Sequence, residues 1–375
     1  PAGISAATFL RRNGVDVTVL EKNERPMGIV EYIIPGFRIS RDDINLDYEM
    51  SVKTGVKYVF NADKNYNVAD LKKQFDFVII ATGAWKKGFC PVSEGADNLT
   101  DALEFLDKSR KAQCKINLGE NIAVIGGGDV AMDCARAAKR AIGAKNVDIV
   151  YRRTKRYMPA EPEEINLALA DEINIKELLS PISYDGKVLK AEIMQLGTMG
   201  ADGRRKTLPT GEYITLEYDT VISATGARVD TEKYKANNID LTEKGYPVLD
   251  ANYQTNIENV YISGDGSKGA SSIVQAVADS KKITKAILTK LNLEHDFIKA
   301  VPQISEQEIR IKKAVLKEST QQKEDGQRCL SCDRVCEICA EVCPNRANVV
   351  IKTNAGSQIM HIDGMCNECG NCGTF

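Results

Sequence analysis

One segment constrains the fold of this chain more than any other. Residues 121–151 comprise an apolar run, a glycine loop, a helix-like stretch and a second apolar run. Within this segment, Gly126, Gly128 and Ala131 have the spacing G-x-G-x-x-A. Small residues at these positions let the backbone approach a pyrophosphate at the amino end of a helix. Because the flanking strands and helix are present, the segment predicts a dinucleotide-binding βαβ unit, and a βαβ unit without a ligand is the alternative.

The residues after this unit indicate which dinucleotide it holds. An NAD site usually places an acid here, where it holds the ribose hydroxyls. This chain instead has Arg152 and Arg153, followed by Lys155 and Arg156. The planar fork of arginine suits a 2′-phosphate, which a carboxylate would repel. We therefore predict NADPH as the ligand, with NADH still possible and a solvated basic loop as the alternative.

Apolar runs that end in a glycine turn recur along the chain and indicate buried strands of parallel sheets. They alternate with helix-like stretches, such as residues 129–142 and 271–291. This alternation predicts an α/β fold with two Rossmann-like nucleotide-binding domains. The four runs are residues 75–83, 121–128, 219–226 and 258–265.

The first residues of the sequence have the pattern of a second, incomplete nucleotide unit. Residues 1–21 show a helix pattern, a turn at Gly14, a β-branched run and then Glu21. Gly3 has the place of the last glycine in a G-x-G-x-x-G loop, and Glu21 has the place of the acid that binds a ribose. Taken alone, this half motif is equally expected of a plain crossover from helix to strand.

A distant segment favours a flavin at this unit. Residues 258–265 end in Gly264 and Asp265, and a helix is predicted to start near Gly269. An acid at this place can bind the ribityl chain of a flavin, and the free amides of the helix can stabilise negative charge on the reduced ring. A simple strand turn is the alternative. The predicted FAD site contains Gly3, Glu21, Gly264, Asp265 and Ser271.

Cysteine is concentrated near the end of the sequence, where eight of the eleven cysteines follow residue 328. Disulfide scaffolds belong to secreted chains, and nothing in the sequence indicates export, so a metal module is favoured. Closely spaced thiolates with a Cys-Pro pair are typical of ferredoxins that hold two 4Fe-4S clusters. Zinc is the alternative, but Cys-Pro is no part of its usual pattern. The predicted ligands are Cys329, Cys332, Cys336, Cys339, Cys343, Cys366, Cys369 and Cys372.

The spacing assigns these ligands only in part. Cys343, which precedes Pro344, is expected to join the last three cysteines around one cluster. The first four cysteines are expected to hold the other, but one gap has three residues where ferredoxins have two, so that ligand set stays open. The remaining cysteines, Cys90, Cys114 and Cys134, stand alone and are expected to be ordinary buried or surface residues.

Composition excludes several classes of function. The formal net charge of -2 shows no basic excess, so nucleic acid is not an expected partner. No stretch approaches the roughly 20 apolar residues that a membrane span needs, and no leader pattern is present, so we expect a soluble, cytoplasmic protein. With only His295 and His361, a histidine-centred triad is not expected. Both ends of the sequence lie inside motifs, and we expect it to be a fragment.

Several segments together resemble the NADPH-dependent glutamate synthase small-subunit family of flavoproteins. They are GIVEYIIPGFRISRD, IIATGAWK, IGGGDVAMDCARAAKR, VDIVYRRTKRYMPA, ISATGA and YISGDGSKGASSIVQAVADSKK, all before about residue 292. The resemblance implies further FAD contacts at Gly28, Thr82 and Gly83. One departure is that Asp279-Ser280-Lys281 stands where the family has D-G-R. The terminal cysteines are closer still to one branch, to which selenate reduction is ascribed.

The resemblance also implies an order of domains. An FAD domain in two parts surrounds an inserted NAD(P)H-binding domain, and a linker leads to a small ferredoxin-like 4Fe-4S domain. The expected ranges are 1–118 and 228–292 for the FAD domain, 119–227 for the NAD(P)H-binding domain, 293–327 for the linker and 328–375 for the 4Fe-4S domain.

These observations predict an NAD(P)H-dependent FAD and iron-sulfur oxidoreductase. No catalytic side chain is predicted, because hydride transfer needs no protein nucleophile. Electrons are expected to pass from NAD(P)H through FAD to two 4Fe-4S clusters, and on to a partner protein or a substrate-reducing site of the selenate reductase type. The reverse direction is also allowed. The alternatives are an electron donor of the glutamate synthase small-subunit type and a non-catalytic iron-sulfur relay or scaffold.

Overall fold

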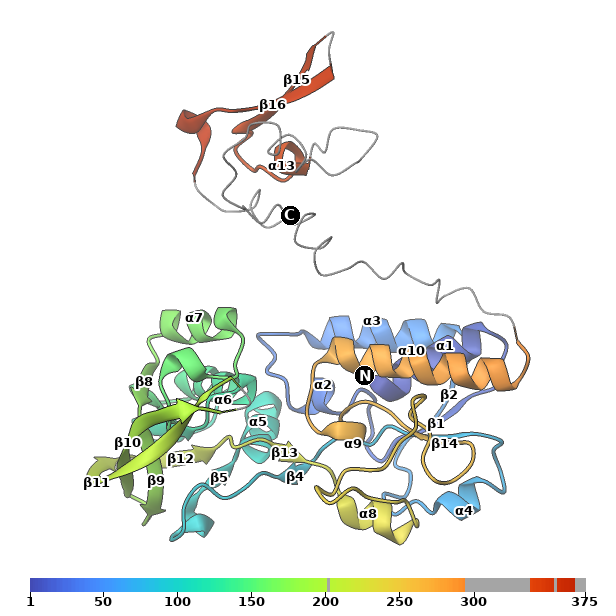
Figure 1. The fold of residues 1–375 in the computed structure, drawn as a ribbon, viewed down its shortest axis with the longest axis horizontal. Coiled ribbons are helices and arrows are strands. Elements are labelled where there is room, and N and C mark those ends of the chain that lie inside the picture. Colours follow the sequence, from blue (N-terminus) through green and yellow to red (C-terminus); the bar gives the residue numbers. More distant parts are fainter. Residues whose placement is uncertain (201–202, 294–337, 354–355, 368–375) are drawn as a thin grey trace. The chain divides into compact units, whose positions relative to one another are not determined.

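The chain forms two units, Pro1–Ile298 and Lys299–Phe375, in the computed structural model (Figure 1). The structure describes residues 1–200, 203–293, 338–353 and 356–367. The first unit consists of two lobes, which we name from the path of the chain. The outer lobe contains residues 1–87 and 227–293, and the inserted lobe contains the described residues of 88–226.

A five-stranded parallel sheet forms the centre of the inserted lobe. Its order is β5-β12-β6-β7-β8. Apolar and β-branched residues suit strands that are covered on both faces, and Ile122, Val124 and Ile149 are all 0% exposed. The strands are β5 (Thr100–Asp101), β6 (Asn121–Ile125), β7 (Asn146–Tyr151), β8 (Asn174–Glu177) and β12 (Thr220–Ser223).

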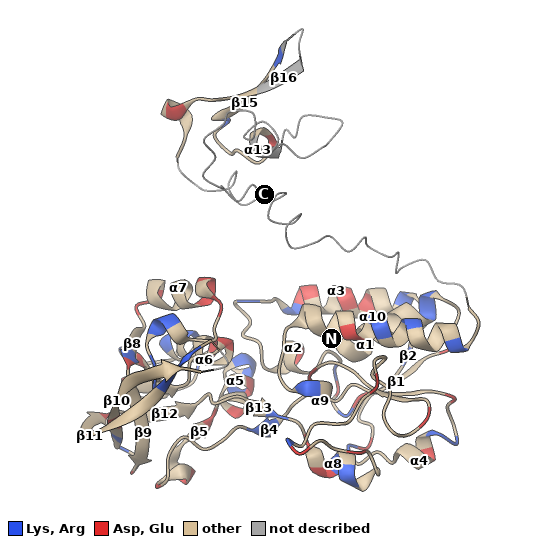
Figure 2. Ribbon diagram, viewed as in Figure 1, with Lys and Arg blue, Asp and Glu red and all other residues tan. Residues whose placement is uncertain are grey.

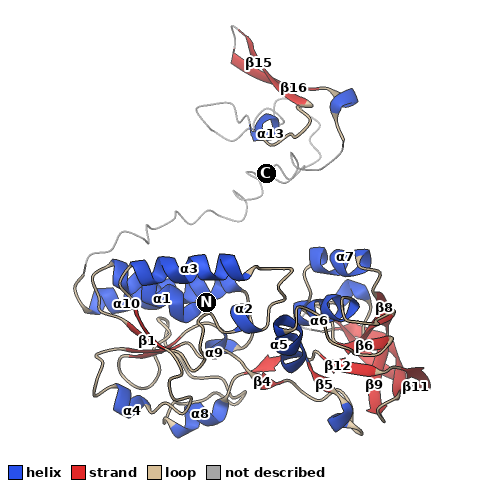
Figure 3. Cartoon of the chain, turned by 180° about the vertical axis from the view of Figure 1, so that it is seen from behind, coloured by secondary structure: helices blue, strands red, loops and turns tan. Residues whose placement is uncertain are grey.

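Each face of this sheet is covered by a different layer (Figure 3). Helices cover one face, where Phe105, Leu106 and Met132 join the core. An antiparallel sheet of order β11-β10-β9 covers the other, with Tyr184 and Leu189 buried between the two sheets. The elements are η1 (Ala96–Asn98), α5 (Ala102–Lys111), α6 (Asp129–Lys139), η2 (Lys155–Tyr157), α7 (Pro162–Ala170), β9 (Leu179–Tyr184), β10 (Val188–Met199) and β11 (Arg205–Glu217).

Two short pairs of parallel strands and a layer of helices form the outer lobe. Strand β1 pairs with β2, and β3 pairs with β14. Helices α1 and α10 pack together through a buried cluster that includes Leu10, Ile283 and Ile287. Figure 1 shows α3 beside these two helices, with α4 and α8 on the opposite side of the strands. The elements are α1 (Ala2–Arg12), β1 (Thr18–Leu20), α2 (Ile29–Tyr32), α3 (Arg41–Lys53), β2 (Lys57–Val59), α4 (Val68–Leu71), β3 (Val78–Ile80), α8 (Thr231–Ala236), β14 (Val260–Ile262), α9 (Asp265–Lys268) and α10 (Ile273–Lys290).

Two neighbouring strands carry the chain between the lobes. Strand β4 (Lys86–Lys87) leads out of the outer lobe, and β13 (Ala227–Arg228) leads back and pairs with it antiparallel. The two paths touch, since a Cβ on Gly88 would lie 2.3 Å from the carbonyl oxygen of Gly226. Glycine at position 88 is therefore required by the close approach of these two backbones.

Most predicted elements are present in the described structure. Each of the four apolar runs contains a strand, namely β3, β6, β12 and β14, and the α/β fold is confirmed. The boundary between the lobes differs from the one expected at residue 119, because β5 and α5 already pack on the five-stranded sheet. Strand β5 has only two residues, too few to show a pattern in the sequence.

The described part of the second unit is a short hairpin with a helical turn on each side. Strand β15 (Asn348–Thr353) pairs antiparallel with β16 (Gly356–His361), preceded by α13 (Ile338–Glu341) and followed by η3 (Asp363–Met365). A ferredoxin-like fold for this unit stays a prediction, because most of the predicted cysteine ligands lie outside the described residues.

The surface of the described chain has mixed charge. Acidic and basic residues are distributed over both lobes (Figure 2), in keeping with the formal net charge of -2. Within the described ranges, no helix has the length and apolar character required to span a membrane.

Candidate functional site

The strand order places a ligand site at the amino end of α6. From β6 the sheet continues through β7 and β8 on one side and through β12 and β5 on the other. Ligands of open α/β sheets bind beyond the carboxyl ends of the strands, at the point where the order reverses. The glycine loop, residues 126–128, leaves β6 at this point. The loop that the spacing singled out therefore lies where such a sheet binds its ligand.

The three glycines of the loop have different roles. A Cβ on Gly126 would lie 2.3 Å from the carbonyl oxygen of Ala224, and one on Gly127 would lie 2.5 Å from the ring of Tyr151. These two glycines are therefore required by contacts inside the protein. A Cβ on Gly128 would meet nothing nearer than 3.9 Å. Gly128 thus borders open space directly before α6, where a pyrophosphate would lie.

The first turn of α6 directs backbone amides towards that space. Gly128 is the N-cap residue, and among the described residues no side chain caps the helix. The N–H of Ala131 donates to the Gly128 carbonyl at 2.9 Å, which starts the helical hydrogen bonds. Amides that precede this bond are available to an anion, and the helix dipole favours its charge. The site therefore fits the pyrophosphate of a dinucleotide.

The basic residues after β7 divide into fastened and free side chains. Arg153 Nε donates to the carbonyl oxygen of Arg205 on β11 at 2.7 Å. Arg152 and Arg156 are exposed, and in the described chain no hydrogen bond or ion pair holds either guanidinium group. The free guanidinium groups can receive a phosphate, whereas Arg153 attaches its loop to the antiparallel sheet.

In the outer lobe, the starts of α1 and α10 meet the ends of β3 and β14. A Cβ on Gly264 would lie 2.9 Å from Cβ of Ala2, and one on Gly3 would lie 3.4 Å from Cβ of Ala81. Ser280 Oγ donates to the Ala2 carbonyl at 2.8 Å. Two predicted residues that are distant in sequence, Gly3 and Gly264, are therefore brought to the same place. Their lack of side chains permits the close approach.

Asp265 and Ser271 form a second predicted pair. Asp265 Oδ1 accepts hydrogen bonds from the N–H and the hydroxyl of Ser271, each at 3.0 Å. Partial burial raises the pKa of Asp265, and the bonds from Ser271 oppose that rise. The predicted start of the helix near Gly269 was wrong. Helix α10 begins at Ile273, because the short helix α9 and a turn at Gly269, with φ +95°, come first.

Trp85 connects three further predicted residues and was missed by the sequence analysis. A Cβ on Gly28 or on Gly83 would lie 3.5 Å from its ring, and its indole N–H donates to the Thr82 carbonyl at 2.9 Å. The available signal was that the only tryptophan of the chain directly follows a glycine turn. Glu21, also predicted, follows β1, and its Oε1 accepts the N–H of Asn23 at 2.9 Å.

The edge of the outer lobe therefore has features that fit a flavin nucleotide. Tyr234 supports it, since its hydroxyl donates to the Gly266 carbonyl at 2.9 Å, and a Cβ on Gly266 would lie 3.8 Å from the Gly83 nitrogen. The backbones of the turns after β3 and β14 therefore lie close to each other, with no side chain between them. Closely approaching backbone beside a helix start is the arrangement that a phosphate or a flavin ring requires.

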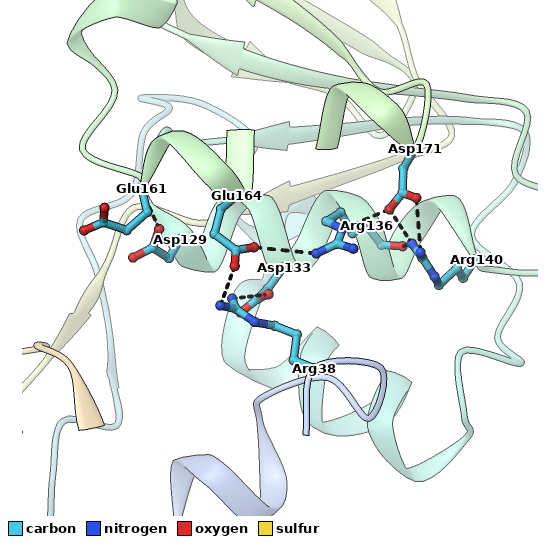
Figure 4. A network of polar contacts seen from close by, with 8 residues as sticks. All are labelled: Arg38, Asp129, Asp133, Arg136, Arg140, Glu161, Glu164 and Asp171. Atoms are coloured by element: carbon cyan, nitrogen blue, oxygen red, sulfur yellow. Dashed lines mark hydrogen bonds and ion pairs between the residues drawn. The ribbon is translucent and has the colours of Figure 1, made fainter. Parts of the chain in front are cut away.

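A network of charged side chains joins the two lobes beside α6 (Figure 4). Arg38 of the outer lobe reaches Asp133 on α6 at 2.8 Å and Glu164 on α7 at 2.6 Å. Farther along α6, Arg136 and Arg140 pair with Asp171 at 2.9 and 2.7 Å. This network could not be predicted from the sequence, because its members are distant along the chain.

Asp133 in this network predicts a pH dependence of stability. Burial raises its pKa to about 6, although Arg38 acts to lower it. A pKa above the ordinary value means that the contribution of this group to stability is full below about pH 4 and is lost as the pH rises through 6. Asp133→Asn removes the titration. The free energy of unfolding of the variant should therefore rise relative to that of the wild type by up to about 3 kcal/mol between pH 4 and pH 7.

Urea unfolding of both proteins across this range measures the difference. Asp47→Asn is the matched control for loss of one carboxylate, since Asp47 is exposed on α3. The charged groups that face Asp133 are Arg38, Glu164 and Asp129, and all three are retained in the variant. A difference between variant and wild type that stays constant from pH 4 to pH 7 would contradict the assignment.

Cys343 in the second unit has the surroundings of a stabilised thiolate. The N–H of Ala347 donates to its Sγ at 3.2 Å, and backbone N–H groups, that of Asn348 first, lower its pKa. Amides that donate to sulfur stabilise thiolates and tune cluster ligands. The arrangement therefore fits the role that the sequence predicted for this residue.

The hairpin brings the segments of Cys343 and Cys366 together. Asn348 at the start of β15 pairs with His361 at the end of β16, and the N–H of Ile362 donates to the Ala347 carbonyl at 2.7 Å. The segment that precedes the hairpin and the segment that follows it therefore meet at its base. Within the described ranges, no group of three potential metal ligands is gathered. The predicted ligands Cys329, Cys332, Cys336, Cys369 and Cys372, and the side chain of Cys339, lie outside the described residues.

The three isolated cysteines have ordinary environments. Cys134 is 0% exposed in the core of the inserted lobe, where burial raises its pKa well above the usual value. Cys90 is exposed and Cys114 is half-buried. All three are free cysteines.

Comparison with known proteins identifies relatives over the whole chain. Residues 1–280 match the sequence profile of the pyridine nucleotide-disulphide oxidoreductases. YgfK of Escherichia coli K12 is 37% identical over 389 residues, which cover 100% of this chain and 38% of YgfK. The NADPH glutamate synthase small chain of Azospirillum brasilense is 28% identical, over 76% of this chain and 64% of that one.

Solved structures share the fold of the first unit. FprA of Mycobacterium tuberculosis, in complex with NADPH, superposes with a TM-score of 0.62 at 17% identity, over 77% of this chain and 82% of FprA. The resemblance to the glutamate synthase small-subunit group, expected from the sequence, is confirmed by these comparisons. The chain spans 38% of the length of YgfK.

Proposed function

Because the chain belongs to the pyridine nucleotide-disulphide oxidoreductase family, we propose that it takes electrons from NADPH through bound FAD and passes them to two 4Fe-4S clusters. The observation that carries this proposal is that one unit contains two separate glycine sites. One is the loop of residues 126–128 before α6, and the other lies between α1 and α10 at Gly3 and Gly264. We call these two sites the glycine cradles. A protein that oxidises a nicotinamide with a flavin needs one site for each nucleotide.

The inserted lobe supports NADPH as the electron source. Gly126, Gly128 and Ala131 would hold the pyrophosphate at the start of α6, and Arg152 and Arg156 would hold the 2′-phosphate. Arg153 would act mainly by fixing the loop against β11, through its bond to the Arg205 carbonyl at 2.7 Å. NADH remains a weaker substrate in this proposal, because its ribose has no phosphate for the free arginines.

The outer lobe supports FAD as the resident cofactor. Gly3, Gly264 and Asp265 would face its pyrophosphate and ribityl chain, and Glu21 its adenosine ribose. Of the other predicted contacts, Thr82 and Gly83 follow β3, Gly28 precedes α2 and Ser271 precedes α10. When bound, the flavin supplies the chemistry that converts a two-electron hydride into single electrons. The protein aligns the two rings and excludes water.

The terminal cysteines support cluster binding. The amides around Cys343 stabilise a thiolate, and the segments that carry Cys343 and Cys366 meet at the base of the hairpin. The remaining ligands are proposed from their spacing alone. Zinc would leave the electrons of the flavin without a one-electron acceptor inside the chain.

The partner of the reduced clusters is proposed by class. We propose an electron-accepting protein or domain. Reduction of an oxyanion such as selenate is one reaction that we propose for this partner. A second candidate, favoured by the match to the glutamate synthase small chain of Azospirillum brasilense, is delivery of electrons to an amidotransferase-like subunit. The proposed location is the cytoplasm.

Anaerobic mixing of the purified holoprotein with NADPH tests the proposal. The flavin absorption band should bleach, and iron and acid-labile sulfide should be present in equal amounts. Dithionite treatment of the same sample shows that the flavin can be reduced at all. A flavin that dithionite bleaches and NADPH does not would sink the proposal, and so would zinc in place of iron.

A further inference from the structure

One loop of the outer lobe is docked on the inserted lobe. This bridging loop, residues 33–40, runs from the end of α2 to the start of α3. Its far end is fixed in the outer lobe, because Ser40 caps α3 and α3 packs on α1. Its near end is fixed in the inserted lobe, because Ile33 is 4% exposed in the core with Phe105 and Met132. The loop therefore connects the two lobes independently of β4 and β13.

The backbone of the bridging loop is held by α5. Arg110 donates to the carbonyl oxygens of Ile34 and Ile39. Within the loop, the N–H of Arg38 donates to the Pro35 carbonyl at 2.9 Å. These bonds set the position from which the side chains of Phe37 and Arg38 extend over α6.

Arg38 makes two contacts with the inserted lobe, one to each of two helices. Its Nη1 lies 2.8 Å from Asp133 on α6, and its Nη2 lies 2.6 Å from Glu164 on α7 (Figure 4). The carboxylates are 9% and 13% exposed, and the Arg38 side chain is 30% exposed. Removal of Arg38 would leave the poorly hydrated Asp133 carboxylate without its charged partner, which is unfavourable. Glu164, in contrast, would retain Arg136 at 3.5 Å.

Phe37 adds a contact on the same helix. The guanidinium carbons of Arg136 and Arg140 lie 5.0 and 4.5 Å from the centre of its ring. Both arginines belong to α6 or its C-cap and are held by Asp171. The loop thus touches α6 at its second turn through Arg38 and at its last turn through Phe37, which fixes the direction of the helix as well as its distance from the outer lobe.

We propose that Arg38 is a positioning residue for transfer between the two nucleotide sites: by bridging Asp133 and Glu164, it sets how the cradle before α6 faces the outer lobe. The inference rests on the proposed function, since the second site must be occupied for the distance to matter. The cradle directly precedes α6, which carries Asp133, so a shift of α6 displaces the bound dinucleotide by a similar amount. Hydride transfer responds steeply to such displacements, and about 1 Å can cost 100-fold.

Stopped-flow reduction of the full-length holoprotein by NADPH tests this inference. In Arg38→Ala, the limiting rate constant of flavin bleaching should fall about 10-fold or more. The Kd for NADP⁺ and the flavin content should remain within about twofold of the wild type, because Arg38 touches neither cradle. Arg38→Lys retains the charge but not the two-pronged reach, and should give an intermediate rate. Arg11→Ala is the matched control. It breaks an ion pair with Asp16, and the side chains of Arg11 and Arg38 are both 30% exposed.

Each outcome decides a different point. Failure of the wild type to be bleached by NADPH would defeat the proposed function itself. A wild type that is bleached, with both Arg38 variants as fast as Arg11→Ala, would overturn the positioning role. A loss of NADP⁺ affinity or of flavin that accounts for the whole effect would also overturn it, because that is the result of a merely structural role. If Arg38→Ala does not fold, Arg38→Lys alone decides between these outcomes.

Discussion

Replacement of both Arg152 and Arg156 by alanine is expected to raise the KM for NADPH about 100-fold and to leave the KM for NADH nearly unchanged. Both side chains are exposed beyond β7, and within the described chain they have no other partner. A bond between arginine and phosphate contributes about 1.5–3 kcal/mol, and the loss of two bonds therefore corresponds to a factor of about 100 or more. Because NADH has no 2′-phosphate, its KM should not respond to the replacement.

Steady-state rates with ferricyanide as the electron acceptor measure both KM values. Lys187→Ala is the control, since it removes a positive charge from the turn before β10 of the same lobe. An equal rise in the KM for NADH would contradict the assignment, because it would place the arginines on a part common to both nucleotides. No rise in either value would identify them as a solvated basic loop.

Cys343→Ala is expected to lower the iron content of the holoprotein by about half, while NADPH still bleaches the flavin. The sulfur of this residue accepts an amide hydrogen bond from Ala347 at 3.2 Å, and the replacement removes a proposed ligand from one of the two proposed clusters. Transfer to an external one-electron acceptor protein should fall in proportion to the clusters lost, because the flavin itself is unaffected.

Iron and sulfide analysis of the purified protein, beside flavin absorbance, checks this result. Cys90→Ala is the matched control, since Cys90 is an exposed thiol of the first unit. Unchanged iron in Cys343→Ala would show that this cysteine is no ligand. Loss of flavin bleaching together with iron would show that the two units do not fold independently.

The sequence was sufficient for those parts of the fold that depend on local pattern. The four apolar runs with glycine turns located β3, β6, β12 and β14, because buried parallel strands need continuous apolar residues. The position of the glycine loop before α6 was predicted, since the requirement for small side chains acts over a few neighbouring positions. The antiparallel strands β9, β10 and β11 were not predicted, because they lack the continuous apolar runs that marked the others, and β11 is exposed at most of its positions.

Contacts between distant segments were beyond the reach of a single sequence. Arg38 meets Asp133 and Glu164 across separations of 95 and 126 residues, and nothing in the local pattern links them. Trp85 likewise touches Gly28 only in the folded chain. For the same reason, the bond from Arg153 Nε to the Arg205 carbonyl could not be predicted, since it depends on where β11 lies.

The pairing of β4 with β13 means that the inserted lobe begins and ends at adjacent points of the outer lobe. A segment with neighbouring ends can be exchanged as a cassette without altering the path of the surrounding chain. In the proposed function, the choice between NADPH and NADH resides in that cassette, whereas the proposed flavin turns reside outside it. Selection for a different reductant can therefore act on one replaceable piece, provided that the new piece retains the acids that meet Arg38.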